Sequence, residues 1–150
     1  MNVYDYGGFW RRTIAYCIDK MILYLLSLIL FIAAVALSHI FFSSGATDNM
    51  PAMFRKAFYL SFYATTIVLN MLYFTYFHGT VGQTPGKKML GLKVIQTSGA
   101  PMTLGIAFLR WVGYLVSGIV FYLGFIWVGI DVRKQGWHDK IAGTYVTKIR

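Results

Sequence analysis

Two long runs of apolar residues dominate the hydrophobic pattern of the chain. Met21 to Phe42 and Ala57 to Phe77 contain no formally charged residue. Each run is about as long as the helix of roughly 20 residues that crosses a hydrocarbon core of about 30 Å. The pattern therefore predicts two membrane-spanning helices. A cleaved signal peptide is the alternative for the first run, but Asp19 and Lys20 lie where such a peptide is apolar.

A third apolar stretch, Thr103 to Ile130, has a different pattern because Arg110 and several glycines interrupt it. At about 1.5 Å per residue it is too short for two full crossings, yet basic residues flank it on both sides. We expect a re-entrant or discontinuous element that breaks near Ser117-Gly118. A single third crossing, which would leave the basic C-terminal tail outside, is the alternative.

Two short segments outside the apolar runs have the composition of β-strands. Gly91 to Ile95 and Thr144 to Ile149 are rich in alternating β-branched and aromatic residues. A lone strand would leave its backbone groups unpaired, so we expect the two segments to pair as a small ribbon. This ribbon would fasten the C-terminal tail to the connection after the second spanning helix.

The composition indicates a membrane protein with one domain, residues 1–150. Hydrophobic residues make up 57% of the chain and charged residues 13%, whereas a soluble domain is about 25% charged. The predicted fold is therefore an all-α membrane protein. It has two spanning helices, a re-entrant or discontinuous third hydrophobic element, and a small cytoplasmic two-stranded ribbon.

The formal net charge of +9 indicates topology rather than nucleic-acid binding, because basic residues in so apolar a chain follow the positive-inside rule. They gather in the second connection and the tail, which predicts a multi-pass protein of the inner (cytoplasmic) membrane with both termini cytoplasmic. Lys87 and Lys88 are candidates for contact with anionic lipid headgroups, or act only on topology. The segment around them lacks the Walker A spacing, so no nucleotide is expected.

The candidate chemistry lies at the start of the first apolar run. At about 100° per residue, Arg12 and Asp19 fall within about 20° of each other on one helix face, with Tyr16 between them. Asp19 is at the edge of the apolar run, where an unpaired charge is costly, so it should face protein or a water-filled cavity. Two interpretations remain open: a buried ion pair with Arg12, or a cation or proton site.

Enzyme chemistry, a metal and a cofactor are not expected. The chain has only five acidic residues and one cysteine, and no serine lies in an elbow-like turn beside a histidine and an aspartate. His138-Asp139 has only His78 as a second imidazole on the same predicted side, which is too little for a metal site.

Three segments resemble the RDD family of small membrane proteins, which is named for an arginine and two aspartates. They are RRTIAYCID, GQTPGKKMLGLKVI and HDKIAGTYV, in the family's order and over nearly the whole chain. The resemblance implies that the arginine is Arg12 and the first aspartate Asp19. It places the second aspartate at Asp139, with Asp131 as the alternative.

Asp139 also has an interpretation from its own surroundings. It would cap or anchor the segment DKIAGT, in which Gly143 ends a short helix before the terminal strand. It is also a candidate partner for Arg12 across the cytoplasmic face.

Two functions are compatible with these features. The resemblance implies either exchange of Na⁺ or K⁺ for protons, as proposed for some family members, or an accessory role in membrane assemblies. The first function is a transporter that uses Asp19 and Arg12. It would work as a homo-oligomer, because two or three helices enclose too little volume for a pathway. The second is a non-transporting scaffold or assembly factor whose partner is another membrane protein and whose Arg–Asp network is structural.

Overall fold

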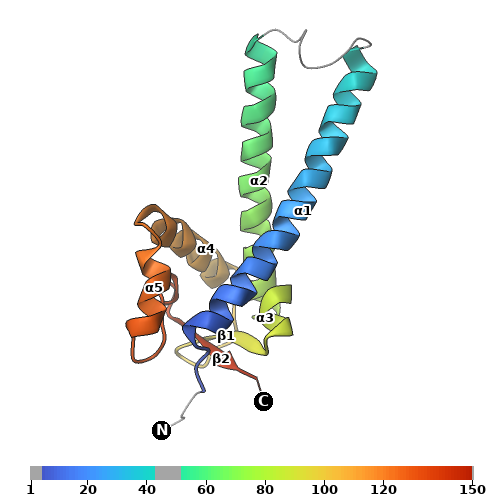
Figure 1. Cartoon of the computed structure of the whole chain (residues 1–150). Helices are drawn as coiled ribbons and strands as arrows, with labels where there is room; N and C mark the ends of the chain where they lie inside the picture. The colour runs from blue at the N-terminus through green and yellow to red at the C-terminus, as the bar shows by residue number, and fades with distance from the viewer. Residues whose placement is uncertain (1–4, 43–51, 150) are drawn as a thin grey trace. The chain divides into compact units, whose positions relative to one another are not determined.

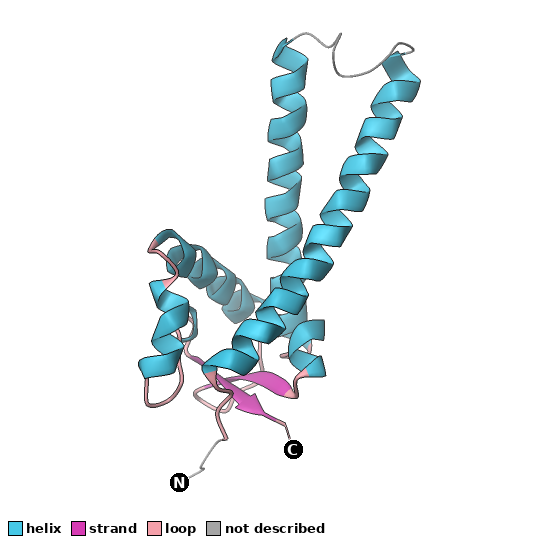
Figure 2. Ribbon diagram, in the orientation of Figure 1, coloured by secondary structure: helices cyan, strands magenta, loops and turns pink. Residues whose placement is uncertain are grey.

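The computed structural model describes residues 5–42 and 52–149. Figure 1 shows the order of the helices and strands by colour, and Figure 2 shows which segments are helices, strands and loops. The elements are α1 (Phe9–Phe42), α2 (Ala52–Thr80), α3 (Pro85–Met89), β1 (Leu92–Gln96), α4 (Leu104–Ile119), α5 (Leu123–Ile130), α6 (Trp137–Ile141) and β2 (Thr144–Lys148). They form two compact units, one of Met1–Lys20 with Met71–Arg150 and one of Met21–Asn70.

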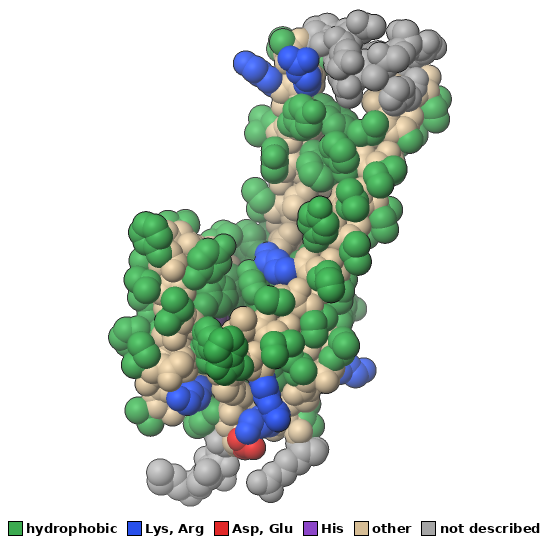
Figure 3. Space-filling model, viewed as in Figure 1, with side chains coloured by type: hydrophobic (Ala, Val, Ile, Leu, Met, Phe, Trp, Pro, Cys, Tyr) green, Lys and Arg blue, Asp and Glu red, His purple; other side chains and the backbone are tan. Residues whose placement is uncertain are grey.

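The helices α1 and α2 are long and apolar enough to cross a membrane over Phe9–Ser38 and Ala52–Thr80. This confirms two candidate spanning helices in the positions that the sequence predicts. Large hydrophobic side chains such as Ile29 and Leu60 are exposed on them, and Figure 3 shows such side chains over one face of both helices. These outward apolar faces are suited to contact with lipid. In a soluble protein, apolar faces of this size would have to be buried.

The unit Met21–Asn70 is held together by aromatic packing. The ring of Phe31 lies 5.1 Å from the ring of Phe62 and 6.2 Å from that of Phe58, measured between centroids. Tilted and edge-on contacts of this kind add about 0.5–1.5 kcal/mol to the burial of the rings. Phe31 is therefore a main packing residue between the two helices of this unit.

The other unit contains the two-stranded ribbon that the sequence predicts. β1 and β2 pair antiparallel, with Val94 opposite Val146. Leu92, Val94 and Val146 are buried together with Ala15 of α1, so the ribbon packs directly on the first turns of α1. The pairing is confirmed, while the cytoplasmic side of the ribbon remains a prediction.

The third hydrophobic element is a broken helix. α4 and α5 meet at an angle of 100°, and the break follows Ile119 rather than Ser117-Gly118. The bend passes through Phe121 and Tyr122, which adopt left-handed φ angles of 48° and 58°. The discontinuity is confirmed with its position shifted towards the C-terminus. The choice between a re-entrant element and a full crossing remains a prediction.

Glycine allows α5 to fold back closely on α4. A Cβ added at Gly124 would lie 2.6 Å from the Cβ of Ser117, which is closer than such atoms can approach. Backbone of one helix thus packs against a small side chain of the other. This close approach brings α5 over the residues that form the polar site.

Candidate functional site

Asp139 of α6 is the centre of a buried ionic network. Its side chain is wholly buried, and each carboxylate oxygen meets a different arginine. The Nη1 atom of Arg12 lies 2.6 Å from Oδ2, and the Nη1 atom of Arg110 lies 2.6 Å from Oδ1. The backbone N–H of Gly136 also donates to Oδ2 at 3.0 Å. One acid therefore joins α1, α4 and α6.

The charge balance of this network keeps Asp139 ionised. Burial alone would raise the pKa of Asp139, but the guanidinium groups of Arg110 and Arg12 outweigh it and hold this pKa well below its ordinary value. A carboxylate that two permanent cations neutralise is poorly available to a passing ion. We therefore interpret Asp139 as a structural residue of the site and not as one that exchanges ions.

Arg12 has further backbone partners that explain its position. Its Nε donates to the carbonyl of Gly7 at 2.8 Å, and its Nη2 donates to the carbonyl of Val146 at 3.3 Å. The guanidinium thus satisfies several groups while it binds Asp139. It links the beginning of α1 to strand β2 as well as to α6.

Arg110 is the site residue that sequence reasoning treated only as an interruption of an apolar stretch. It is 0% exposed, and besides Asp139 it donates to Thr144 Oγ1 at 2.5 Å and to the Tyr114 hydroxyl at 3.4 Å. The sequence did contain one indication of its role. Arg110 is the single charged residue of the apolar stretch Thr103 to Ile130, and a lone charge in a hydrophobic segment usually has a specific partner. The network therefore contains two arginines rather than one.

The hypothesis of an ion pair between Arg12 and Asp19 is wrong. Asp19 is 0% exposed, but it accepts hydrogen bonds from neutral groups. The Tyr73 hydroxyl donates at 2.9 Å, the Thr84 hydroxyl at 2.5 Å and the Gly86 N–H at 2.8 Å. Residues seven apart share a helix face but are about 10 Å apart along its axis. Each therefore finds a nearer partner on another element.

The structure brings Asp139, and not Asp131, to Arg12. Asp131 forms an ion pair with Lys140 at 2.6 Å and accepts from the backbone N–H groups of Arg133 and Gln135. Its side chain is 14% exposed and that of Lys140 is 44% exposed, so this pair lies near the surface. Asp131 closes the loop after α5 and takes no part in the buried network.

Tyr16 lies among aromatic rings on the same side of α1 as Arg12. Its ring centroid is 6.0 Å from those of Phe74 and Tyr114 and 5.4 Å from that of Phe125. Tyr16 thus packs against α2, α4 and α5. In the sequence of α1 it lies between Arg12, which binds Asp139, and Asp19.

The two lysines that the sequence places at headgroup depth have different surroundings. Lys88 is exposed, but Lys87 is only 4% exposed, and its Nζ lies 2.9 Å from Nε2 of His78. Burial lowers the pKa of Lys87. The short helix α3 therefore directs the Lys87 side chain into the protein and not to the surface. Contact of Lys87 or Lys88 with an anionic headgroup stays a prediction.

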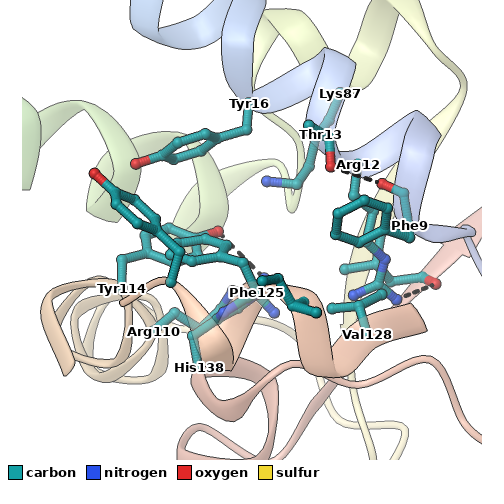
Figure 4. Close-up of a pocket in the computed structure, with 13 residues that line it drawn as sticks. Phe9, Arg12, Thr13, Tyr16, Lys87, Arg110, Tyr114, Phe125, Val128 and His138 are labelled. Carbon is teal, nitrogen blue, oxygen red and sulfur yellow. Dashed lines mark hydrogen bonds between the residues drawn. The ribbon is translucent and has the colours of Figure 1, made fainter. Parts of the chain in front are cut away.

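A cavity of about 300 Å³ adjoins the ionic network. Figure 4 shows labelled side chains from α1, α3, α4, α5 and α6 around it. Its basic and imidazole lining consists of Arg12, Lys87, Arg110 and His138. Its aromatic lining consists of Phe9, Tyr16, Tyr114, Tyr122 and Phe125. The cavity is therefore aromatic and positively charged.

His138 lines this cavity as a neutral base. Burial lowers its pKa to about 3, and its ring centroid is 4.6 Å from that of Tyr114 and 5.0 Å from that of Phe125. Within residues 5–42 and 52–149, no group of three or more His, Cys, Asp or Glu side chains is arranged to hold a metal ion. The cavity chemistry is that of hydrogen bonding and fixed positive charge.

Comparison with known proteins identifies one family over nearly the whole chain. The model of the RDD family matches residues 6–143. "Uncharacterized protein YxaI" of Bacillus subtilis (strain 168) is 37% identical, with 93% of this chain and 95% of the relative covered. "Uncharacterized membrane protein YteJ" of the same strain is 29% identical, with 94% and 80% covered. No solved structure matches the chain. Because the family model covers nearly all of the chain, this protein belongs to the RDD family.

Proposed function

We propose that this RDD-family membrane protein exchanges a monovalent cation for a proton across the inner membrane and that Asp19 is the exchanging carboxylate. One observation carries the proposal. Asp19 is wholly buried in a candidate spanning helix, yet it lies outside the Arg12–Asp139–Arg110 network and is held by neutral groups. An ionisable residue at such a position is a candidate functional site, and ion pathways and proton relays are among the functions that such residues serve.

The chemistry of its partners supports alternate binding of a cation and a proton. The hydroxyl groups of Tyr73 and Thr84 donate to ionised Asp19, but a hydroxyl oxygen can also accept. Hard cations prefer oxygen ligands, and the carboxylate with two hydroxyls supplies them. When Asp19 takes up a proton, its single O–H can donate to one of the same hydroxyls. The binding of either ion thus leaves the local hydrogen bonds satisfied.

The proposal assigns different roles to the two aspartates of the family name. Asp139 holds the fold together with Arg12 and Arg110, and Asp19 is left to exchange ions. The proposed transporter is a homo-oligomer, because the helices of one chain enclose little volume for a pathway. Its termini are cytoplasmic in this proposal, in line with the positive-inside rule.

A non-transporting scaffold is the second candidate, and one observation favours it. The three hydrogen bonds to Asp19 fasten α1 to α2 and to the start of α3. A carboxylate satisfied in this way can be purely structural. In that function both aspartates fix the helices, and another membrane protein or anionic lipids are the partners.

Asp19→Asn separates the two candidates. We expect the variant to fold and to lose cation-dependent proton flux at least about tenfold, because an amide cannot exchange a proton at this site. The measurement uses purified protein in liposomes with an enclosed pH dye and imposed Na⁺, K⁺ or Li⁺ gradients. Size-exclusion profiles of each variant establish that the protein is folded.

Asp131→Asn is the matched control for this measurement, since it makes the same chemical change at a carboxylate paired with Lys140. It should retain flux. Unchanged flux in Asp19→Asn would refute the role of Asp19. Absence of flux in folded wild-type protein would favour the scaffold.

A further inference from the structure

We propose that the cavity between α1, α3, α4, α5 and α6 binds the oxyanion headgroup of a single-chain amphiphile, a fatty carboxylate or an alkyl phosphate. The cavity is distinct from the Asp19 site, and the proposal goes beyond ion exchange. It rests on the charge around the cavity, on buried nitrogen atoms without partners, on the aromatic walls and on the exposed apolar opening.

The cavity has more positive than negative charge. Arg12, Arg110 and Lys87 line it, and Asp139 is the carboxylate that binds both arginines. Among the ion pairs of residues 5–42 and 52–149, none includes Lys87. Its partner is the imidazole of His78. Asp19 and Asp139 act on Lys87 electrostatically, but neither forms an ion pair with it, so an anion in the cavity would give this buried ammonium a direct counter-charge.

Two buried nitrogen atoms at the cavity also have no hydrogen-bond partner in the described structure. They are Nε of Arg110 and Nδ1 of His138, whose side chains are 1% and 6% exposed. Buried polar atoms are almost always paired, so each such atom needs an explanation. The Nε–H of Arg110 is a donor, and an oxyanion with several lone pairs can accept from it and from the Lys87 ammonium together.

The remaining walls are suited to an alkyl chain. The rings of Tyr16, Tyr114 and Phe125 lie 5.4–6.0 Å apart between centroids and cover one side of the cavity, as Figure 4 shows. A volume of about 300 Å³ is at the lower end for small-molecule sites. It accommodates a headgroup and the first carbons, but the rest of a long chain must lie outside.

The bend between α4 and α5 provides the opening for that chain. Tyr122 and Ile126 line the cavity and yet are 62% and 48% exposed, and neighbouring Phe121 is 87% exposed. Two successive non-glycine residues have left-handed φ angles at this bend, a conformation that is unfavourable for residues with a Cβ atom. Such strain is concentrated at binding sites. The tail of the ligand would leave here, along apolar side chains.

Lys87→Gln and Lys88→Gln form a matched pair for testing this proposal. They remove the same charge from adjacent residues of α3, but only Lys87 lines the cavity. Binding is measured by native mass spectrometry and thermal shift in neutral detergent. The probes are dodecanoate, dodecyl phosphate, inorganic phosphate and dodecanol. We expect at least one of the two amphiphilic anions to bind, with affinity reduced about tenfold or more by Lys87→Gln and less than about twofold by Lys88→Gln.

The other probes and a second variant define what would overturn the proposal. Dodecanol should bind at least tenfold more weakly than the preferred anion, and inorganic phosphate should also bind more weakly. Equal affinity for inorganic phosphate would refute an amphiphile, and equal losses in the two lysine variants would indicate surface charge only.

If Lys87→Gln does not fold, Tyr122→Ser at the exposed opening takes its place. It should weaken the amphiphile and leave inorganic phosphate unchanged, and an unchanged amphiphile affinity would overturn the proposal. These binding measurements do not depend on ion flux, so failure of the ion-exchange proposal for Asp19 would leave their outcomes unchanged.

Discussion

Asp139→Asn is expected to destabilise the protein by about 3–5 kcal/mol, because it leaves two buried guanidinium groups without their counter-charge. Arg110 is wholly buried and Arg12 nearly so, each 2.6 Å from the carboxylate. A domain has only about 5–15 kcal/mol of stability, so this substitution removes a large part of it. The measurement is unfolding in mixed micelles, followed by circular dichroism, at neutral pH.

Asp131→Asn is the control for this prediction, because the Asp131–Lys140 pair is near the surface. Such pairs contribute about 0–1 kcal/mol, so the expected loss is small. A loss of less than about 1 kcal/mol in Asp139→Asn, or an equal loss in both variants, would contradict the central position of Asp139.

Gly113→Ala is expected to have the second-largest effect, about 1–3 kcal/mol of destabilisation. A Cβ at Gly113 would lie 2.6 Å from the Cα of His138, so the backbone of α6 must shift away from α4. Because α6 carries His138 and Asp139, the shift would also disturb the ionic network. The melting temperature in neutral detergent reports the loss.

Gly118→Ala on the same helix is the matched control. A Cβ at Gly118 would meet no atom within 4 Å, and alanine favours a helix by up to about 1 kcal/mol over glycine. We therefore expect opposite signs, with Gly118→Ala neutral or slightly stabilising. Destabilisation of equal size in both variants would show that helix α4, and not its contact with α6, controls the effect.

The hydrophobic pattern was sufficient to predict the main elements of the fold. Charge-free runs located α1 and α2, and alternation in two short segments predicted the pairing of β1 with β2. These features depend on local composition and period, which a sequence displays directly. The break in the third hydrophobic element was also predictable to within a few residues, but its exact position was not. It follows Ile119 and passes through Phe121 and Tyr122, which carry no glycine-like signal for left-handed φ angles.

The partners within the site could not be deduced from periodicity alone. Arg12 and Asp19 share a face of α1, yet Arg12 binds Asp139, which is 127 residues away in the chain. Sequence spacing predicts which side chains lie on one face of a helix, but it does not reveal what another helix brings to that face. The same limit explains Lys87, whose burial depends on the orientation of the five-residue helix α3.

The separation of the two aspartates is the central claim about this protein. Asp139 neutralises buried arginines, whereas Asp19 forms no ion pair with them and accepts hydrogen bonds from neutral donors. The first arrangement fixes the fold, and the second leaves a carboxylate whose charge can change.

A pair of double-mutant cycles tests this separation most directly. The cycles combine Arg12→Met with Asp139→Asn and Arg12→Met with Asp19→Asn, and they measure the free energy of unfolding of each variant in mixed micelles. We expect a coupling of about 1.5–3 kcal/mol between Arg12 and Asp139, and a coupling within about 0.5 kcal/mol between Arg12 and Asp19. A larger coupling of Arg12 to Asp19 than to Asp139 would contradict the division of roles.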